Sequence, residues 1–167
     1  MLSSLVRYWG SWFIIAAMGL TELVTLNTPV VAAPTYQDTL NQRMVILKKS
    51  NQRWIEVNLL TQRLIAWEGS KPVYAVIVST GKKSTPTIPG IFNIQSKRRI
   101  DRMKGEDYDI NDVPYVQYYS GGYAIHGAYW HKNFGTTVSH GCINLAVDHA
   151  KWLFDWSEIK TPVVIHP

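Results

Sequence analysis

Residues 126–144 read HGAYWHKNFGTTVSHGCIN and hold the only cysteine of the 167-residue chain, Cys142. Three of the five histidines, His126, His131 and His140, lie in the same stretch. A thiol is a strong nucleophile only as the thiolate, and a neighbouring imidazole can accept its proton. The stretch therefore predicts a site where a cysteine attacks an acyl group, and the rest of the chain is interpreted as its export signal and its scaffold.

Glycines flank these groups, which matters for the oxyanion that forms when a carbonyl is attacked. Gly127 follows His126, and Gly141 precedes Cys142. The backbone N–H groups of Gly141 and Cys142 are the natural oxyanion donors, and Ser139 can shape the turn. We expect the fold to bring His126 to Cys142 and to lower the thiol pKa from its free value of about 8.5.

Other interpretations of these residues are weaker. A lone cysteine is often a small buried hydrophobe, but the flanking Ser-His-Gly favours catalysis. Zinc could be bound by His126, His131, His140 and Cys142, but their spacing matches no strong zinc pattern. Neither a metal nor another cofactor is therefore expected, and His131 is interpreted as a loop residue and His166 as inert.

The composition is that of a single globular domain, with 46% hydrophobic and 17% charged residues. The formal net charge of +5 favours anionic partners, such as nucleic acid or the polymers of a cell envelope. The sequence contains no recognised nucleic-acid-binding module, so nucleic acid is not predicted as a partner. The basic excess is interpreted as a solvated surface.

Residues 1–33 have the organisation of an export signal. Arg7 supplies a positive charge, and Tyr8–Leu20 is an apolar run shorter than the roughly 20 residues of a membrane span. Val31-Ala32-Ala33 offers small residues for cleavage. An uncleaved N-terminal anchor is the alternative, and it would be the protein's only membrane contact. Both interpretations predict an exported protein of the periplasm or the cell wall.

Residues 34–52 are interpreted as a linker with a first short strand at Met44–Leu47, and residues 53–167 as one catalytic domain. Val73–Val78 is almost continuously apolar, so we expect a central strand buried on both faces. The succession of hairpins predicts an antiparallel or mixed sheet. Alternating or apolar runs predict strands at residues 54–59, 63–68, 73–78, 91–95, 115–119, 123–126 and 163–165.

Two segments break the strand pattern. Ser96–Pro114 is charged and has no clear period, and its length is typical of a functional lid or a disordered loop. Apolar residues at helical spacing from Val147 to Phe154 predict a helix before the last strand. His149 on that helix is interpreted as a surface or structural residue.

The combined motif is specific enough to indicate a family. His126-Gly127 followed by Ser139-His140-Gly141-Cys142-Ile143-Asn144 resembles the signature of the L,D-transpeptidase catalytic domain, the YkuD-like family. Further segments that look like the framework of that domain are residues 55–58, 62–64, 79–81, 87–92 and 161–163.

The resemblance implies a mostly β fold, a β-sandwich of mixed sheets with one packed helix. It also implies that Cys142 is the nucleophile and His126 the general base, with a backbone carbonyl orienting the imidazole. The Cys142 N–H would line the oxyanion hole. The residues that would support the site are Ser139, His140, Gly141 and Asn144.

The substrates that the resemblance implies are peptidoglycan stem peptides, as donor and as acceptor. The thiolate would attack the carbonyl of the third stem residue and release the terminal D-alanine. A side-chain amine of a neighbouring stem would then take the acyl group and form a cross-link. Three alternatives remain: an L,D-carboxypeptidase that uses water, a non-catalytic wall-binding protein, and an unrelated cysteine protease, whose local signatures are absent.

Overall fold

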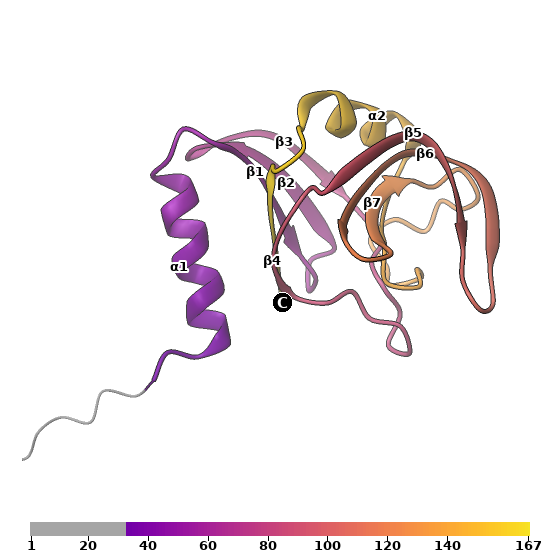
Figure 1. Cartoon of the computed structure of the whole chain (residues 1–167). Helices are drawn as coiled ribbons and strands as arrows, with labels where there is room; N and C mark the ends of the chain where they lie inside the picture. Colours follow the sequence, from indigo (N-terminus) through magenta and orange to yellow (C-terminus); the bar gives the residue numbers. More distant parts are fainter. Residues whose placement is uncertain (1–32) are drawn as a thin grey trace, which may run out of the picture. The chain divides into compact units, whose positions relative to one another are not determined.

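A computed structural model describes residues 33–167, and the predicted export signal therefore lies outside the described residues apart from Ala33. Residues 33–167 form one compact unit of two helices and nine strands. Strands dominate this unit, as the sequence predicts (Figure 1). Within it, neither helix has the length and apolar character needed to cross a membrane.

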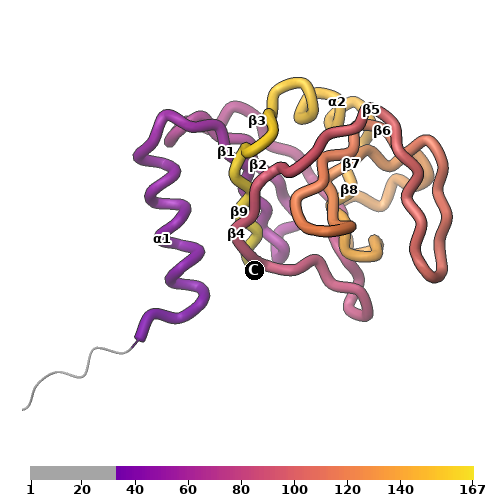
Figure 2. Tube along the Cα trace, in the orientation of Figure 1, coloured from indigo at the N-terminus to yellow at the C-terminus, as the bar shows by residue number. Residues whose placement is uncertain are grey.

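The first sheet has five strands in the order β3-β2-β1-β9-β4. β1 and β9 run parallel, and the other pairs are antiparallel. The last strand along the chain therefore lies between β1 and β4, inside the sheet (Figure 2). The bounds are β1 (Arg53–Asn58), β2 (Arg63–Glu68), β3 (Lys71–Ile77), β4 (Gly90–Asn93) and β9 (Pro162–His166).

The second sheet has four strands in the order β5-β6-β7-β8, and its final pair, β7 with β8, is parallel. A parallel pair cannot be joined by a tight hairpin, so a long connection separates β7 from β8. That connection and the start of β8 contain most of the histidine- and cysteine-bearing stretch. The bounds are β5 (Ser96–Lys104), β6 (Asp109–Ser120), β7 (Tyr123–Gly127) and β8 (Ile143–Leu145).

The two sheets share one hydrophobic core with helix α2 (Val147–Trp156). Ile55 and Val57 come from the first sheet, Ile125 and Ile143 from the second, and Leu153 from α2; all five are fully buried. The fold class is thus confirmed: two mixed sheets with a packed helix. The helix predicted between Val147 and Phe154 is confirmed as well.

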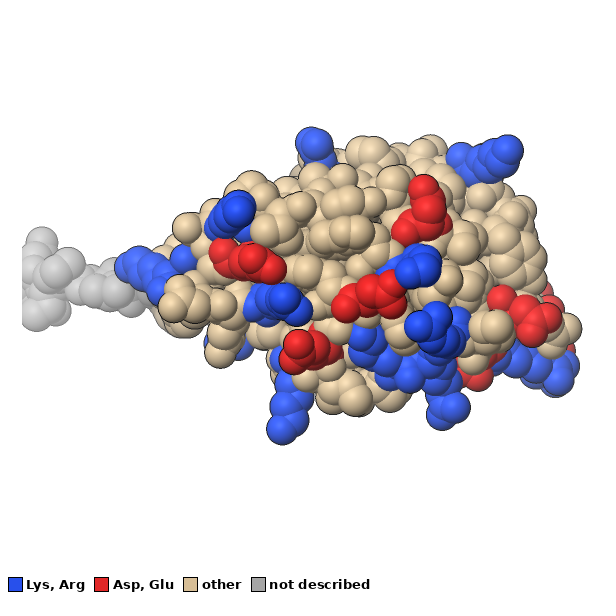
Figure 3. Space-filling view, turned by 90° about the horizontal axis from the view of Figure 1, so that it is seen from above, with Lys and Arg blue, Asp and Glu red and all other residues tan. Residues whose placement is uncertain are grey.

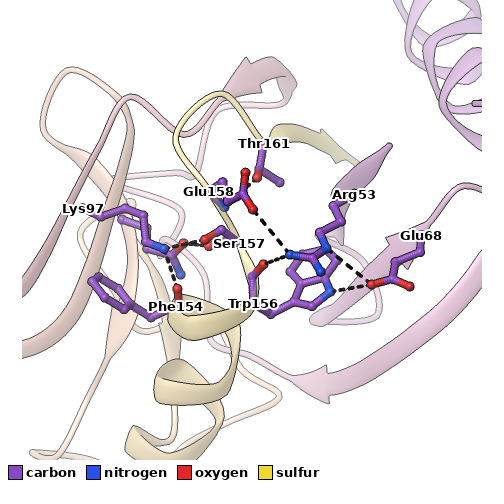
Figure 4. A network of polar contacts seen from close by, with 9 residues as sticks. Arg53, Glu68, Lys97, Phe154, Trp156, Ser157, Glu158 and Thr161 are labelled. Carbon is purple, nitrogen blue, oxygen red and sulfur yellow. Dashed lines mark hydrogen bonds and ion pairs between the residues drawn. The ribbon is translucent and has the colours of Figure 1, made fainter. Parts of the chain in front are cut away.

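The C-terminal end of α2 receives cations from both sheets (Figure 4). Lys97 of β5 donates to the carbonyl oxygens of Phe154 and Ser157, each at 2.5 Å. Arg53 of β1 donates to Trp156 O at 2.9 Å. The last carbonyls of a helix have no intrahelical partner and carry partial negative charge, so these cations fix the helix to both sheets.

The strand predicted at Met44–Leu47 is wrong, because this segment belongs to helix α1 (Tyr36–Lys48). Its start is fixed by a capping box: Thr35 Oγ1 accepts from Asp38 N–H, and the Asp38 carboxylate accepts from Thr35 N–H. Leu40 and Leu47 are buried against Trp54 of β1 and Val164 of β9. The helix thus covers the outer face of the first sheet, and residues 34–52 are not a bare linker (Figure 1).

Two further expectations need correction. β3 is an edge strand, not a central one, and Ile77 is 44% exposed. Tyr74 of β3 is instead covered by the stacked ring of Trp152 from α2, at 3.9 Å between centroids. Ser96–Pro114 is not an irregular loop, because it contains β5 and the first half of β6, which pair antiparallel. Charged side chains on this edge strand hide the period of two and also discourage pairing with another chain.

Figure 3 shows one face of the molecule, on which Lys and Arg lie among Asp and Glu. Surface ion pairs of the domain include Arg53–Glu68 at 3.4 Å and Lys151–Asp155 at 2.5 Å. Such exposed pairs are individually worth about 1 kcal/mol or less.

Candidate active site

The pairing of β7 with β8 brings His126 and Cys142 together, although 16 residues separate them in the sequence. Ile125 pairs with Ile143, and His126 pairs with Asn144. His126 is thus near the end of one strand, and Cys142 directly precedes the neighbouring strand. Both side chains line one cavity of about 250 Å³. The fold therefore places both side chains in one cavity, where the Cys142 thiol lies 3.8 Å from Gly122 O.

All the predicted site residues with side chains reach this cavity, while Gly141 forms the turn at its edge. The polar residues that line it are His126, His131, Ser139, His140, Cys142 and Asn144. Apolar and aromatic side chains form the remaining walls: Met103, Tyr108, Ile110, Trp130 and Val138. A cavity with mostly apolar walls and a few convergent polar groups is the usual form of a small-molecule or peptide site.

The turn before β8 is held by the Ser139 side chain. Ser139 Oγ donates to Cys142 O at 2.6 Å and accepts from Gly141 N–H at 3.1 Å. Gly141 has φ +112°, and a Cβ there would lie 2.5 Å from Tyr123 Cε1, so only glycine fits. The Gly141 N–H already donates to Ser139 Oγ, so the expectation that it donates to an oxyanion is wrong. Of the two expected oxyanion donors, Cys142 N–H remains.

Cys142 is 9% exposed as a residue. Burial raises its pKa to about 11, against the opposing effect of a backbone hydrogen bond from Ala124. The expectation of a lowered thiol pKa is therefore wrong for the resting protein. At neutral pH the sulfur carries its proton, and a base has to remove that proton when the sulfur attacks.

His126 is suited to that role because it is uncharged and correctly oriented. The ring is 3% exposed, and burial lowers its pKa to about 4. Nδ1 lies 3.0 Å from Gly127 O, and a carbonyl only accepts, so Nδ1 carries the hydrogen. Nε2 is then the nitrogen with the free lone pair. A backbone carbonyl thus orients the imidazole, as the family resemblance implies.

His140 faces the β5–β6 hairpin. Its Nε2 lies 3.1 Å from Asp107 Oδ2 and 3.1 Å from Lys82 Nζ. Its ring stacks on Tyr108, with 4.7 Å between the centroids. These contacts hold the hairpin tip against the turn that carries Cys142, so the segment predicted as a lid is an ordered hairpin whose tip closes one wall of the cavity.

His131 is a cavity residue that the sequence interpretation missed. Its Nε2 lies 2.9 Å from the Asn144 side-chain amide, and Asn133 N–H donates to its Nδ1 at 3.2 Å. The amide nitrogen Nδ2 of Asn144 faces His131, and the buried Asn144 Oδ1 has no hydrogen-bond partner among the described residues. The spacing of residues in the sequence gives no sign that His131 lines the cavity.

A metal centre finds no support in this arrangement. Within residues 33–167 there is no group of three or more His, Cys, Asp or Glu side chains placed to hold a metal ion. His126 and His131 instead make hydrogen bonds to Gly127 and Asn144. The cysteine and histidine side chains that line the cavity are residue types that can take part in acid–base and nucleophilic chemistry.

Comparison with known proteins gives consistent matches. A family described as the L,D-transpeptidase catalytic domain (YkuD) matches residues 52–165. The chain is 29% identical over 131 residues to the putative L,D-transpeptidase YciB of Bacillus subtilis, covering 70% of this chain and 67% of that protein. It is also 33% identical over 99 residues to L,D-transpeptidase 1 of Mycobacterium tuberculosis, of which the chain covers only 39%.

The solved catalytic domain of the Enterococcus faecium L,D-transpeptidase has the same fold. The TM-score is 0.63 and the identity 28%, with coverage of 70% of this chain and 98% of that one. An LD transpeptidase, LdtMt1, solved in complex with imipenem, gives a TM-score of 0.64 and 27% identity, covering 68% of this chain and 58% of that chain. This chain thus corresponds to the catalytic portion of longer relatives.

Proposed function

Because the chain belongs to the family of L,D-transpeptidase catalytic domains, we propose that it cross-links peptidoglycan stem peptides through an acyl-enzyme on Cys142. The observation that carries the proposal is the joint presence of Cys142 and His126 in one cavity, with His126 on β7 and Cys142 directly before the parallel strand β8. A protein that only binds the wall needs neither a nucleophile nor a base. The fold alone would not distinguish these possibilities.

In the first half-reaction Cys142 Sγ attacks the carbonyl of the third stem residue as His126 Nε2 accepts the thiol proton. The oxyanion of the tetrahedral intermediate is stabilised by Cys142 N–H. The C–N bond to the terminal D-alanine breaks, and the His126 imidazolium returns its proton to the leaving amine. The products are a thioester on Cys142 and free D-alanine.

In the second half-reaction a side-chain amine of a neighbouring stem attacks the thioester and gives a proton to His126. Collapse of the intermediate forms the new amide and releases the Cys142 sulfur, which takes back the proton. The apolar walls formed by Met103, Trp130 and Val138 disfavour water as a competing nucleophile. The buried Asn144 Oδ1, which has no hydrogen-bond partner among the described residues, supports the site as an acceptor for an N–H of a bound peptide.

The neutral thiol and neutral imidazole define how the reaction starts. Both groups are uncharged between pH values of about 4 and 11, the pKa values of His126 and Cys142. In the resting protein the thiol therefore keeps its proton, and His126 accepts that proton in the course of the reaction. Such general-base assistance contributes typically about 10²- to 10⁴-fold to a rate.

We further propose that the protein works outside the cytoplasmic membrane, in the periplasm or the cell wall, where its substrate lies. The support is the charged and apolar pattern of residues 1–33. Fusion of this segment to a reporter that is active only after export tests the proposal. Reporter activity that is independent of the segment contradicts it.

Intact-mass measurement with imipenem tests the acyl-enzyme. The wild-type protein should gain one imipenem adduct, and Cys142→Ala should gain none. Cys142→Ser is a matched control, because it replaces the thiol by a hydroxyl of similar size. This variant should acylate far more slowly than the wild-type protein. An adduct that forms on Cys142→Ala at the wild-type rate contradicts the assignment of the nucleophile.

Product analysis with purified muropeptides tests the reaction itself. A cross-linked dimer with release of D-alanine supports transpeptidation. A shortened monomer without dimer indicates that water resolves the acyl-enzyme and makes the protein an L,D-carboxypeptidase. Binding to muropeptides with no change in their mass indicates a wall-binding protein.

A further inference from the structure

Thr87 links two loops that the sequence separates by more than fifty residues. It lies in the connection between β3 and β4, and it is 4% exposed. Its Oγ1 donates to Gly141 O at 2.7 Å and accepts from Gly81 N–H at 2.9 Å. The Gly81 N–H can only donate, so the single hydrogen of the Thr87 hydroxyl is left to donate to Gly141 O.

The hydrogen bond to Gly141 O bears on the candidate oxyanion donor. Gly141 O and Cys142 N–H belong to the same peptide group, which is planar and trans. In a trans peptide the C=O and the N–H point in opposite directions. An oxygen held by Thr87 on one side therefore directs the Cys142 N–H to the other side.

Neighbouring contacts can select the orientation of this peptide group. Glycine reaches the φ of +112° found at Gly141 without strain and can also leave it, so a hydrogen bond to its carbonyl restricts that freedom. The loop that carries Thr87 is closely packed at Gly81, where a Cβ would lie 2.2 Å from Thr85 O. Lys82 N–H also donates to Ser139 O at 3.0 Å, so the two loops are joined at a second point.

We propose that Thr87 is a positioning residue for the oxyanion donor: its hydroxyl orients the Gly141–Cys142 peptide so that Cys142 N–H faces the attacked carbonyl. The proposal rests on the acyl-enzyme function proposed above. Thr87 does not touch the reacting atoms and acts only through this peptide group. Its loss should therefore slow acylation without blocking access to the sulfur.

The pair of variants Thr87→Val and Thr87→Ser separates the hydroxyl from the methyl group. Valine has the shape of threonine and cannot donate, whereas serine keeps the hydroxyl. Acylation by imipenem should fall about 10- to 100-fold in Thr87→Val and recover most of the wild-type rate in Thr87→Ser, since an oxyanion donor contributes up to about 10³-fold. Thr87→Val acylating at the wild-type rate overturns the proposal.

Alkylation of Cys142 by iodoacetamide distinguishes positioning from a general disturbance of the site. This displacement at a saturated carbon forms no oxyanion, so Thr87→Val should be alkylated within about twofold of the wild-type rate. If alkylation falls in parallel with acylation, Thr87 merely holds the site together, and the proposal fails.

The single cysteine supplies a direct readout of the peptide orientation. Labelling with ¹⁵N-cysteine gives one amide resonance, that of Cys142. Thr87→Val should shift this resonance, while Thr87→Ser should leave it near the wild-type position. An unchanged resonance in Thr87→Val overturns the proposal. If the valine variant does not fold, Thr87→Ala removes the same hydroxyl without new atoms and is judged by the same criteria.

The outcomes for the two proposals are separable. A wild-type protein that imipenem does not acylate contradicts the proposed acyl-enzyme function. The resonance of Cys142 in the valine and serine variants still tests whether Thr87 sets the direction of its N–H. A wild-type protein that acylates, with a valine variant that acylates equally well, contradicts only the role of Thr87.

Discussion

The Nδ1 of His126 donates to the carbonyl oxygen of Gly127 at 3.0 Å, so the backbone sets the tautomer of the imidazole. No carboxylate contacts this ring in the part of the chain that the structure describes. The backbone is a neutral acceptor and leaves the pKa of the imidazole low, at about 4, because burial disfavours its charged form. The ring is therefore available as a base over the whole neutral range.

The first prediction concerns that base. His126→Gln should slow imipenem acylation by about 10²- to 10⁴-fold, because the amide keeps the size of the ring and cannot accept the thiol proton. His149→Gln is the control, since His149 lies on α2 and contacts Tyr74 at 2.6 Å outside the cavity. The His149→Gln variant should be acylated by imipenem at the wild-type rate. Equal rates in His126→Gln and His149→Gln contradict the role of His126.

The second prediction concerns the pH dependence of the thiol. With a pKa of about 11, the rate of iodoacetamide alkylation of Cys142 should rise about tenfold per pH unit between pH 7 and pH 10. A thiolate–imidazolium pair present at rest would instead give a flat profile above pH 5 or 6. In urea the same thiol should titrate near its free value of about 8.5, which provides the internal control.

The third prediction concerns a polar pair far from the cavity. His166 Nε2 lies 3.0 Å from Glu56 Oε1, and both side chains are mostly buried. The hydrogen bond that His166 donates to the Glu56 carboxylate raises the pKa of His166. Burial alone would raise the pKa of Glu56, but the hydrogen bond and charge of His166 lower it on balance.

The sign of the linked stability follows from these directions. The His166 contribution is complete below the ordinary pKa of 6.5 and is lost as the pH rises through the raised value. The Glu56 contribution is complete above 4.5 and is lost as the pH falls through the lowered value. The free energy of unfolding should therefore fall by about 1–2 kcal/mol as the pH rises from 6 to 9. Urea unfolding of His166→Gln should show a flatter pH profile; a slope unchanged from wild type contradicts this account.

The fourth prediction concerns the docking of α1. Leu47 is 1% exposed and packs against Trp54 and Val164, whereas its neighbour Ile46 is 57% exposed. Leu47→Ala should lower the free energy of unfolding by about 2–5 kcal/mol through lost burial and the cavity left behind. Ile46→Ala should stay within about 0.5 kcal/mol. Equal effects in denaturant unfolding would show that α1 does not add to the stability of the domain.

The residues that line the cavity were the most predictable part of the candidate site. Cys142 and His126 stand out because they are rare residue types beside glycines, and the β7–β8 pairing only has to bring them together. The sequence could not indicate the thiol pKa, because burial is a property of the whole fold. The role of Thr87 was equally hidden, since a threonine in a loop becomes informative only when its partners are known.

The errors in the fold have separate physical causes. Met44–Leu47 is too short an apolar run to distinguish a strand from a helix, and the capping box at Thr35 and Asp38 was the missed signal. The apolar run of β3 suggested a central strand, but β3 lies at the edge of its sheet, and an aromatic residue of α2 packs against its apolar side chains. The β5–β6 hairpin escaped detection because an edge strand with charged side chains shows little alternation in hydrophobicity.

The protonated, enclosed state of Cys142 has a consequence for the lifetime of the protein. Peroxide converts cysteine to sulfenic acid through the thiolate, at a rate that follows ionisation and access. The thiol of a cysteine that is 9% exposed, with a pKa of about 11, should resist such damage at rest. With no second cysteine in the chain, oxidation also cannot close an internal disulfide. The same burial that makes the nucleophile depend on His126 should thus keep it intact in oxidising surroundings.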